Sequence, residues 1–405
     1  MFGNLPRFSL SEPEIRPDGS IVIGFTFVDL DQSPVTVPMQ GLYEGRVDSD
    51  YVSLLTIAVP EEQYAQHQPT IEQIVQSYQL NASVVPPAAE TGDDSTTEPE
   101  APLPEQTNVL TFGQEIATLS GHAGGLWGVT FHPDGSLLAS ASNDMTVKLW
   151  DVASLTELKT LSGHTGGVRA VAFSPDGSML ATGSIDTSIK LWSVPDGEEI
   201  ATLTGHSDEV AGLAWSPDGK QLVSGSKDTT ALIWDVASRS VLRTLPDHQH
   251  WVESVDWSPD GSLIVSGSLD NTVKLWNAVT GVVSQTLYGH THWVLPTTFS
   301  PDGSMVASGS ADTGVRVWSV ETGQELLTLW GYTNEVRSVA FSPDGSLLAS
   351  GSEDETAQIW RMPAGEPVIT LEPGSSAAWV VFSPDGQTLA MALGNGQIKL
   401  WHVGR

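Results

Sequence analysis

Most of this chain alternates between short apolar stretches and compact polar turns. Apolar stretches rich in β-branched and aromatic residues, each ended by a turn, predict β-strands. Between residues 126 and 161 four such stretches follow one another: Leu126–Phe131, Leu137–Ser142, Thr146–Asp151 and Leu158–Leu161. The turn after the first stretch is His132-Pro133-Asp134-Gly135, and the turn after the second contains Asn143-Asp144. The segment therefore predicts four strands, named A to D in chain order, in one antiparallel sheet.

The same pattern returns at a fixed spacing. A Trp ends strand C in every copy, at intervals of 42, 42, 42, 42, 42 and 41 residues: Trp150, Trp192, Trp234, Trp276, Trp318, Trp360 and Trp401. A Pro-Asp-Gly turn also recurs once per copy, at residues 133–135, 175–177, 217–219, 259–261, 301–303, 343–345 and 384–386. A period of about 40 residues with one small sheet per copy is typical of a β-propeller. The pattern predicts a mainly β protein with seven blades.

The repeat also carries the signature of a known family. Gly205–Asp235 reads GHSDEVAGLAWSPDGKQLVSGSKDTTALIWD, with Gly-His at its start and Trp-Asp at its end. In spacing and motif, residues 111–405 resemble the WD-repeat (WD40) family. The resemblance implies a seven-bladed β-propeller, and the near-identity of the repeats is similar to bacterial members of the family.

The seventh repeat predicts how the ring closes. The chain ends at Arg405, soon after the seventh strand C, so that blade has no strand D after it. Residues 113–119, GQEIATL, repeat the strand D pattern of residues 323–329, GQELLTL, and have no blade before them. Because an open sheet edge is a site of aggregation, we expect residues 113–119 to complete blade seven from the amino-terminal side.

The region before the propeller predicts two further parts. Residues 1–80 predict a small α+β domain, with strands over 20–29, 42–47 and 51–59 and a helix over 61–80. Its order of strand, strand, helix is similar to the carboxy-terminal half of PsbP-like bacterial extracytoplasmic domains. Residues 81–110 hold five prolines and few large apolar residues, which predicts a disordered acidic linker.

The charge limits the classes of partner. The net charge is −32, with 3 basic and 17 acidic residues in 1–110 and 14 basic and 32 acidic residues in 111–405. Phosphate backbones and anionic membranes attract basic surfaces, so we expect neither nucleic acid nor membrane as a partner. The charge has two interpretations, solubility and attraction of a basic protein or peptide.

Other features of the sequence say little about the cellular compartment of the protein. Cysteine is absent, which excludes disulfides and thiolate sites. No apolar run is long enough to span a bilayer, and the first residues show no signal peptide. These features predict a cytoplasmic protein by default, or an extracytoplasmic one if the amino terminus is incomplete, with a monomeric propeller.

A His, a Ser or Thr, an Asp and a Trp recur in each of the first five repeats. In the WD-repeat family such residues form a structural hydrogen-bond network, and a site repeated several times lacks the single asymmetric arrangement that catalysis requires. We therefore expect neither catalysis nor a bound cofactor or metal at these positions, although Ser142 is an alternative to Ser140. The network residues are His122, Ser140, Asp144, Trp150, His164, Thr182, Asp186, Trp192, His206, Ser224, Asp228, Trp234, His248, Ser266, Asp270, Trp276, His290, Ser308, Asp312 and Trp318.

The last two repeats depart from this pattern. The sixth has Tyr332 in place of the His. The seventh has no His, Met391 in place of the Ser and Asn395 in place of the Asp, and only Trp401 remains. We expect the seventh blade to be the least stable.

Residues that vary between repeats are the candidates for binding. Just after Gly-His the variable positions carry Trp and Arg, the residue types that dominate interface hot spots. We predict one binding face of Trp127, Arg169, Trp251, Trp293 and Arg337, with His250, His292, Trp330 and Tyr332 beside it. Before the turn Asp, we expect Ile185 and Leu269 to be exposed parts of this face. The alternative is that Trp251 and Trp293 only fill loops.

These observations support three hypotheses of function. The first is a non-enzymatic scaffold that binds a protein or peptide on the loop face of the propeller. The second is a sensor or regulatory part of a larger bacterial signalling or extracytoplasmic protein. The third is an enzyme with carboxylates at the channel mouth, for which Glu209, Glu253 and Glu335 are the candidates.

Overall fold

The computed structural model describes residues 7–10, 14–15, 21–22, 25–28 and 110–404. The chain divides into two units, Met1–Pro104 and Glu105–Arg405. In the first, β1 (Arg7–Leu10) pairs antiparallel with β4 (Phe25–Val28), and β2 (Glu14–Ile15) with β3 (Ile21–Val22). β3 and β4 fall in the strand predicted over 20–29. The predicted strands 42–47 and 51–59, the helix 61–80, linker residues 81–109 and the boundary at 80 lie outside the described residues. All the predicted domain boundaries stay predictions.

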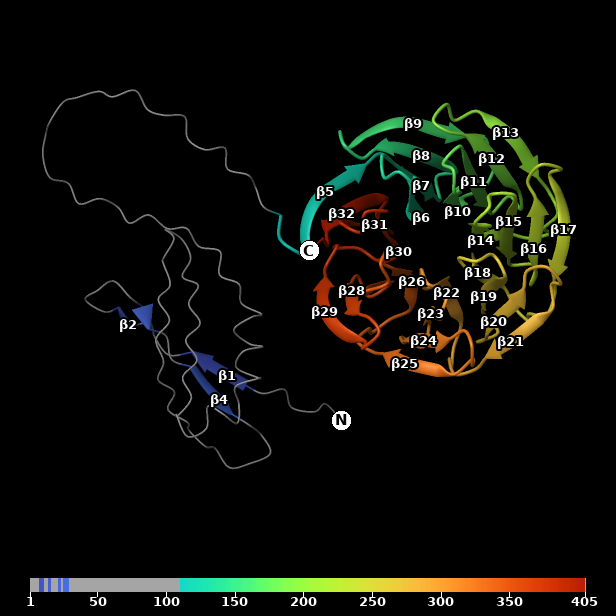
Figure 1. The fold of residues 1–405 in the computed structure, drawn as a ribbon. Helices are drawn as coiled ribbons and strands as arrows, with labels where there is room; N and C mark the ends of the chain where they lie inside the picture. Colours follow the sequence, from blue (N-terminus) through green and yellow to red (C-terminus); the bar gives the residue numbers. More distant parts are fainter. Residues whose placement is uncertain (1–6, 11–13, 16–20, 23–24, 29–109, 405) are drawn as a thin grey trace, which may run out of the picture. The chain divides into compact units, whose positions relative to one another are not determined.

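The second unit is a seven-bladed propeller, as the repeat predicts. Seven four-stranded antiparallel sheets surround a channel, and Figure 1 shows strand A of each sheet innermost and strand D outermost. The blade strands have the bounds β6 (Leu126–Phe131), β7 (Leu137–Ser142), β8 (Thr146–Asp151) and β9 (Thr156–Ser162); β10 (Val168–Phe173), β11 (Met179–Ser184), β12 (Ile189–Ser193) and β13 (Glu199–Leu203); β14 (Val210–Trp215), β15 (Gln221–Ser226), β16 (Ala231–Asp235) and β17 (Ser240–Leu245); β18 (Val252–Trp257), β19 (Leu263–Ser268), β20 (Val273–Asn277) and β21 (Val283–Leu287).

Blades five to seven continue the series. Their strands are β22 (Val294–Phe299), β23 (Met305–Ser310), β24 (Val315–Ser319) and β25 (Glu325–Leu329); β26 (Val336–Phe341), β27 (Leu347–Ser352), β28 (Ala357–Arg361) and β29 (Glu366–Leu371); β30 (Ala377–Phe382), β31 (Thr388–Leu393) and β32 (Gln397–His402), which β5 (Gln114–Ser120) completes.

The ring closes through β5, as predicted. β5 pairs antiparallel with β32, with Ala117 opposite Leu400 and Leu119 opposite Ile398. The Lys399 Nζ atom lies 2.8 Å from the Glu115 carboxylate. The same strand C to strand D ion pair joins Lys148 to Glu157 at 2.8 Å within blade 1, so the closing strand repeats a contact of an ordinary blade.

The core lies between neighbouring blades. The first residue of strand A is fully buried in the five central blades: Val168, Val210, Val252, Val294 and Val336. Burying a valine of this kind stabilises the fold by roughly 1.5–3 kcal/mol. Since each blade has apolar residues on both faces of its sheet, it is stable only between two neighbours.

The Pro-Asp-Gly turns fix the A–B connections. In blade 1 the Gly135 N–H donates to the His132 carbonyl at 2.8 Å, and Gly135 has a φ of +77°. The Asp134 carboxylate accepts hydrogen bonds from the Ser136 N–H and hydroxyl at 2.8 and 2.6 Å. Glycine is required here because other residues rarely adopt this backbone conformation.

Candidate protein-binding face

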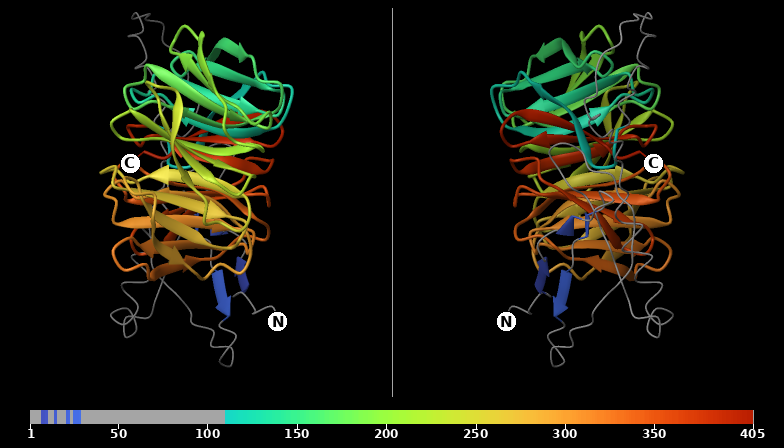
Figure 2. Two further views of the ribbon diagram at one scale, coloured as in Figure 1. Left: turned by 90° about the vertical axis from the view of Figure 1, so that its right-hand side faces the viewer. Right: turned by 90° about the vertical axis from the view of Figure 1, so that its left-hand side faces the viewer.

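The propeller has two faces with different loops (Figure 2). Since the strands alternate in direction, the D–A loops and B–C turns share one face, which we call the His face because it carries the repeated histidines. The A–B and C–D turns share the opposite face, which we call the PDG face after its Pro-Asp-Gly turns.

Hydrogen bonds connect the four network side chains of blade 1. His122 Nδ1 lies 2.9 Å from Asp144 Oδ2, and His122 Nε2 lies 2.8 Å from Ser140 Oγ. The Trp150 indole N–H donates to the same Ser140 oxygen at 2.9 Å. The three contacts recur in blades 2 to 5 between the equivalent residues, with Thr182 in place of the serine in blade 2. They tie the D–A loop to the B–C turn and to strand C.

The two candidate serines of strand B have separate partners. Ser140 contacts His122 and Trp150, whereas the Ser142 hydroxyl donates to the Gly124 carbonyl at 3.0 Å and accepts from the Asp144 N–H at 3.1 Å. One serine therefore connects side chains, and the other holds the loop backbone.

In blades 1 and 2 the electrostatics of the network favour a neutral histidine beside an ionised aspartate. Burial raises the pKa of Asp144, but hydrogen bonds from Thr146, Ala123 and His122 outweigh it and hold the pKa at about 2. The pKa of Asp186, Asp228, Asp270 and Asp312 is also lowered. Burial lowers the pKa of His122 and His164, despite the neighbouring carboxylates that raise it. The hydroxyl oxygens at the centre of the network are fully buried, which leaves no access for a substrate: Ser140, Thr182, Ser224, Ser266 and Ser308.

Blade 6 replaces the histidine with a buried tyrosine. The Tyr332 hydroxyl lies 2.6 Å from Ser350 Oγ and accepts from the Gln358 N–H at 3.0 Å. The expectation that Tyr332 belongs to the exposed face is wrong, because its ring fills the volume of the missing His. In blade 7 the Trp401 indole N–H is buried without a hydrogen-bond partner, since Met391 supplies no hydroxyl.

A β-bulge divides the predicted Trp/Arg face in two. In blade 1 Leu126 pairs with Ser142 and Gly128 with Ala141, which leaves Trp127 as the extra residue; Arg169 and Arg337 are extra in the same way. A bulge re-aims the side chain of its extra residue. Trp127, Arg169 and Arg337 line one cavity of about 40 Å³ at the channel mouth. Trp251 and Trp293, one position before the first paired residue, stay on the surface with 37% and 40% exposure.

Ion pairs fill the channel mouth. Arg169 contacts the carboxylates of Glu209 and Glu253, from the next two blades, and its guanidinium lies 4.6 Å from the centre of the Trp127 ring. Lys227 Nζ lies 2.9 Å from the Glu209 carboxylate. Burial raises the pKa of Glu209, but the hydrogen bond and charge of Lys227 outweigh it and lower the pKa.

The second arginine of the mouth is also paired. Arg337 contacts Glu335 at 3.1 Å and Glu353 at 2.9 Å. The three glutamates considered as catalytic candidates, Glu209, Glu253 and Glu335, therefore all contact an arginine.

A further carboxylate joins two blades in the channel wall. Asp256 accepts hydrogen bonds from the Trp257 N–H, the Thr298 hydroxyl and the Phe299 N–H, each at 2.9 Å. It lines a channel cavity of about 340 Å³. Burial raises its pKa to about 6 despite these three donors. Its signal in the sequence is a single Asp where the neighbouring repeats have Ala214 and Thr298.

The two hydrophobic residues expected before the turn Asp differ in exposure. Ile185 is 36% exposed on blade 2, but Leu269 is only 6% exposed, so its predicted place on the surface is wrong. Lys227 lies 4.2 Å over the ring of Trp251, and the repeat places Leu269 in the same position relative to Trp293. By this analogy we infer that the Trp293 ring covers Leu269.

Two exposed aromatic residues extend the Trp251 and Trp293 surface. Tyr288 and Trp330 directly follow strand D of blades 4 and 5 and are 75% and 57% exposed. The repeat positions equivalent to them hold Ser120, Ser162, Thr204, Pro246 and Glu372. We call Trp251, Tyr288, Trp293 and Trp330 the aromatic array.

The array has a regular arrangement on the His face. The Trp293 carbonyl accepts from the Ala311 N–H at 2.9 Å, next to the B–C turn of blade 5. Trp330 covers the other end of that turn, because its ring lies 3.1 Å from where a Cβ on Gly314 would stand. Each of the two blades therefore carries one tryptophan at the start of strand A and a second aromatic residue at the end of strand D. The sequence places Trp330 beside the predicted face but not Tyr288, which a comparison of the residue after strand D in every repeat would have found.

The described part of the chain lacks two other kinds of site. It contains no group of three or more His, Cys, Asp or Glu side chains arranged to hold a metal ion. Within the same ranges, no helix has the length and apolar character that crossing a membrane requires.

Known protein families agree with this architecture. Residues 126–297 match the model of the Echinoderm microtubule-associated protein second beta-propeller. Residues 281–319, 323–361 and 365–402 match the model of the WD domain, G-beta repeat. This propeller is a WD-repeat propeller. Propellers of this family typically serve as scaffolds for interactions between proteins.

Three fungal proteins align with short parts of the chain. Nuclear distribution protein PAC1 of Scheffersomyces stipitis is 42% identical over 55 residues, 14% of this chain and 10% of that protein. Eukaryotic translation initiation factor 3 subunit I of Phaeosphaeria nodorum is 48% identical over 40 residues, 10% of this chain and 12% of that protein. Periodic tryptophan protein 2 homolog of Schizosaccharomyces pombe is 50% identical over 42 residues, 10% of this chain and 5% of that protein. The chain matches a small part of each, and these fungal relatives give no support to a bacterial origin.

Proposed function

We propose that this WD-repeat propeller is a non-enzymatic platform that holds a protein or peptide on its His face, over blades 4 and 5. The observation that carries the proposal is the aromatic array, four exposed aromatic side chains at equivalent positions of adjacent blades. Tyrosine and tryptophan supply large contact areas at low cost in conformational entropy and dominate binding hot spots.

The loops beneath the array support it in a fixed position. Asp270 and Asp312 bind the histidines of these loops at 2.8 and 2.9 Å and accept the N–H groups of Gln249 and Thr291 at 3.0 and 2.9 Å. A preorganised surface loses little entropy when a partner binds. The network is therefore the support of the binding face and performs no chemistry of its own.

The partner lies across the face and does not enter the channel. The mouth cavity of about 40 Å³ holds little more than one or two water molecules. The ion pairs of Glu209, Glu253 and Glu335 also give no support to an enzyme at the mouth.

The surface favours a basic partner segment. Residues 111–405 carry 14 basic and 32 acidic residues. Within the chain, the Lys227 ammonium group already lies over the ring of Trp251, which shows that a ring of the array can hold a cation. A lysine or arginine of the partner would make the same contact with Trp293 or Trp330, and its affinity would fall with added salt.

Quantitative capture tests the proposal. The tagged full chain and a variant with Trp251, Tyr288, Trp293 and Trp330 all changed to Ala are used to capture proteins from the source cells, followed by mass spectrometry. A matched control changes Leu158 and Leu242, exposed on outer strands of blades 1 and 3, to Ala. We expect specific partners with the wild type and the control and their loss with the array variant. Equal capture by the array variant would refute this face.

A further inference from the structure

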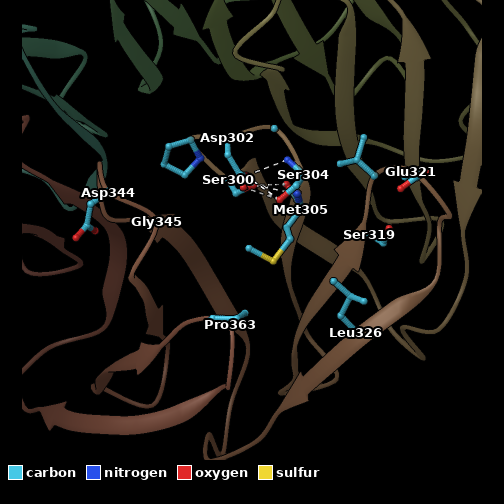
Figure 3. Close-up of a pocket in the computed structure, with 13 residues that line it drawn as sticks. Ser300, Asp302, Ser304, Met305, Ser319, Glu321, Leu326, Asp344, Gly345 and Pro363 are labelled. Atoms are coloured by element: carbon cyan, nitrogen blue, oxygen red, sulfur yellow. Dashed lines mark hydrogen bonds between the residues drawn. The ribbon is translucent and has the colours of Figure 1, made fainter.

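A groove opens on the PDG face at the boundary of blades 5 and 6. It has a volume of about 860 Å³ and is lined by the A–B turns of both blades and by their C–D turns (Figure 3). The apolar part of its lining includes Met305, Leu326 and Pro363. Met305 packs on the core between these blades, and Leu326 is 51% exposed. The groove therefore joins an apolar floor to open solvent.

The register of strand D explains the exposure of Leu326. In blade 5 Val317 pairs with Leu327 and Trp318 with Glu325, so Leu326 is the extra residue of a β-bulge. Its side chain has no partner across the strand pair. It lies at the groove, across from the A–B turn of blade 5 in Figure 3.

The boundary also lacks a polar bridge that other boundaries have. Arg243 donates to the Thr280 carbonyl at 3.3 Å between blades 3 and 4, and Gln285 donates to the Val320 carbonyl at 2.9 Å between blades 4 and 5. The equivalent residue of blade 5 is Leu327, whose side chain packs near Gly365 of blade 6 and donates nothing. The rim beside the groove is therefore apolar, as the equivalent positions of blades 2, 6 and 7 are, whereas those of blades 1, 3 and 4 carry Lys159, Arg243 and Gln285.

The charged residues at the groove are all acidic. Asp302, Glu321 and Asp344 line it, and no Lys or Arg is among its lining residues. Asp302 accepts from the Ser300 hydroxyl at 2.6 Å and from the Ser304 N–H at 3.0 Å, and these bonds lower its pKa and keep it ionised at neutral pH.

We infer that this groove is a second docking site, which takes a short protein segment with one large apolar side chain between lysines or arginines. The apolar side chain lies against Met305 and Leu326, and its basic neighbours face Asp302, Glu321 and Asp344. The site lies on the opposite face from the aromatic array. The chain then holds two partners at once, which extends the proposed function without depending on the array.

Synthetic peptides test the groove on the full chain. The probes are fluorescent peptides of about eleven residues with a central Leu between pairs of Lys, the same peptide with a central Ser, and the same with Glu in place of Lys. Fluorescence anisotropy measures their affinities. We expect the Lys-Leu-Lys peptide to bind at least about tenfold more tightly than either of the others. It alone has both a Leu side chain that the groove can bury and lysines that attract the acidic residues of the groove. Equal affinities would overturn the proposal.

Two variants locate the binding. Leu326→Lys combined with Glu321→Lys changes two exposed side chains, and we expect it to weaken the peptide about tenfold or more. Leu158→Lys, the same strand position in blade 1, leaves the affinity unchanged. The thermal melting of each variant confirms its fold. A photoreactive version of the peptide labels residues 300–326 or 344–363, and labelling elsewhere would contradict the site.

The array variant separates the two proposals. We expect the variant with all four array residues changed to Ala to bind the groove peptide with unchanged affinity. This result is expected whether or not the variant still captures the partners of the His face. Loss of the groove peptide in the array variant would place the peptide on the His face and overturn the groove.

Discussion

The closing strand offers the sharpest test of how this propeller is held together. Leu119 lies on β5 and is buried between blade 7 and blade 1, in a cluster with Leu126 and Leu400. Leu203 has the same repeat position on strand D of blade 2, between blades 2 and 3. Their exposures are 5% and 2%, so the two sites bury equal side chains.

The expected cost follows from this burial. Changing a buried Leu to Ala removes apolar contacts and leaves a cavity, at about 2–5 kcal/mol of unfolding free energy. If β5 contributes to the fold as an ordinary strand D does, Leu119→Ala and Leu203→Ala lower the unfolding free energy by amounts within about 1 kcal/mol of each other. Urea unfolding followed by tryptophan fluorescence measures both values.

Two results would refute this account of closure. One is a cost below about 1 kcal/mol for Leu119→Ala beside a cost of about 2–5 kcal/mol for Leu203→Ala. The other comes from removal of residues 109–120, which we expect to unfold or aggregate the propeller. A shortened chain that stays monomeric with an unchanged Tm would show that the ring does not need β5.

Three further predictions follow from single sites. Asp256 has a folded pKa of about 6, above its usual 3.8, so its contribution to stability is fully present below pH 4 and is lost as the pH rises through 6. As the pH rises from 4 to 7, the unfolding free energy of Asp256→Asn should therefore increase relative to that of the wild type by up to about 3 kcal/mol. Urea unfolding measures both values, and a difference that does not change with pH would contradict this. Ser140→Ala leaves buried groups of His122 and Trp150 without a partner and should cost about 1–3 kcal/mol, whereas a cost near zero would show that water replaces the hydroxyl. Hydrogen exchange should be fastest in blade 7, where the Trp401 N–H has no acceptor, and equal protection of all blades would count against this.

The number of blades, the order of the strands and the closure of the ring could all be predicted from the sequence. These features are local or repeated: each strand is a short apolar stretch between turns, and each Trp lies one period from the next. The hydrogen bonds of His122 and Asp144 could be predicted for the same reason, because the first five copies hold a His and an Asp at the same offset. When several copies share one pattern, each copy supports the same assignment of strands and turns, because all copies must form the same blade.

Which variable residues share a surface could not be predicted from the sequence, because it depends on how the blades are arranged in three dimensions. Strand periodicity places alternate residues on one side, but a bulge adds one residue and turns its side chain elsewhere. Trp127 and Arg169 therefore lie at the channel mouth, while Trp293 stays on the rim. Arg169 reaches Glu253, 84 residues along the chain, because the ring brings blades 2 and 4 together around the mouth. No local pattern contains that contact, since it depends on the diameter of a channel that all seven blades set together.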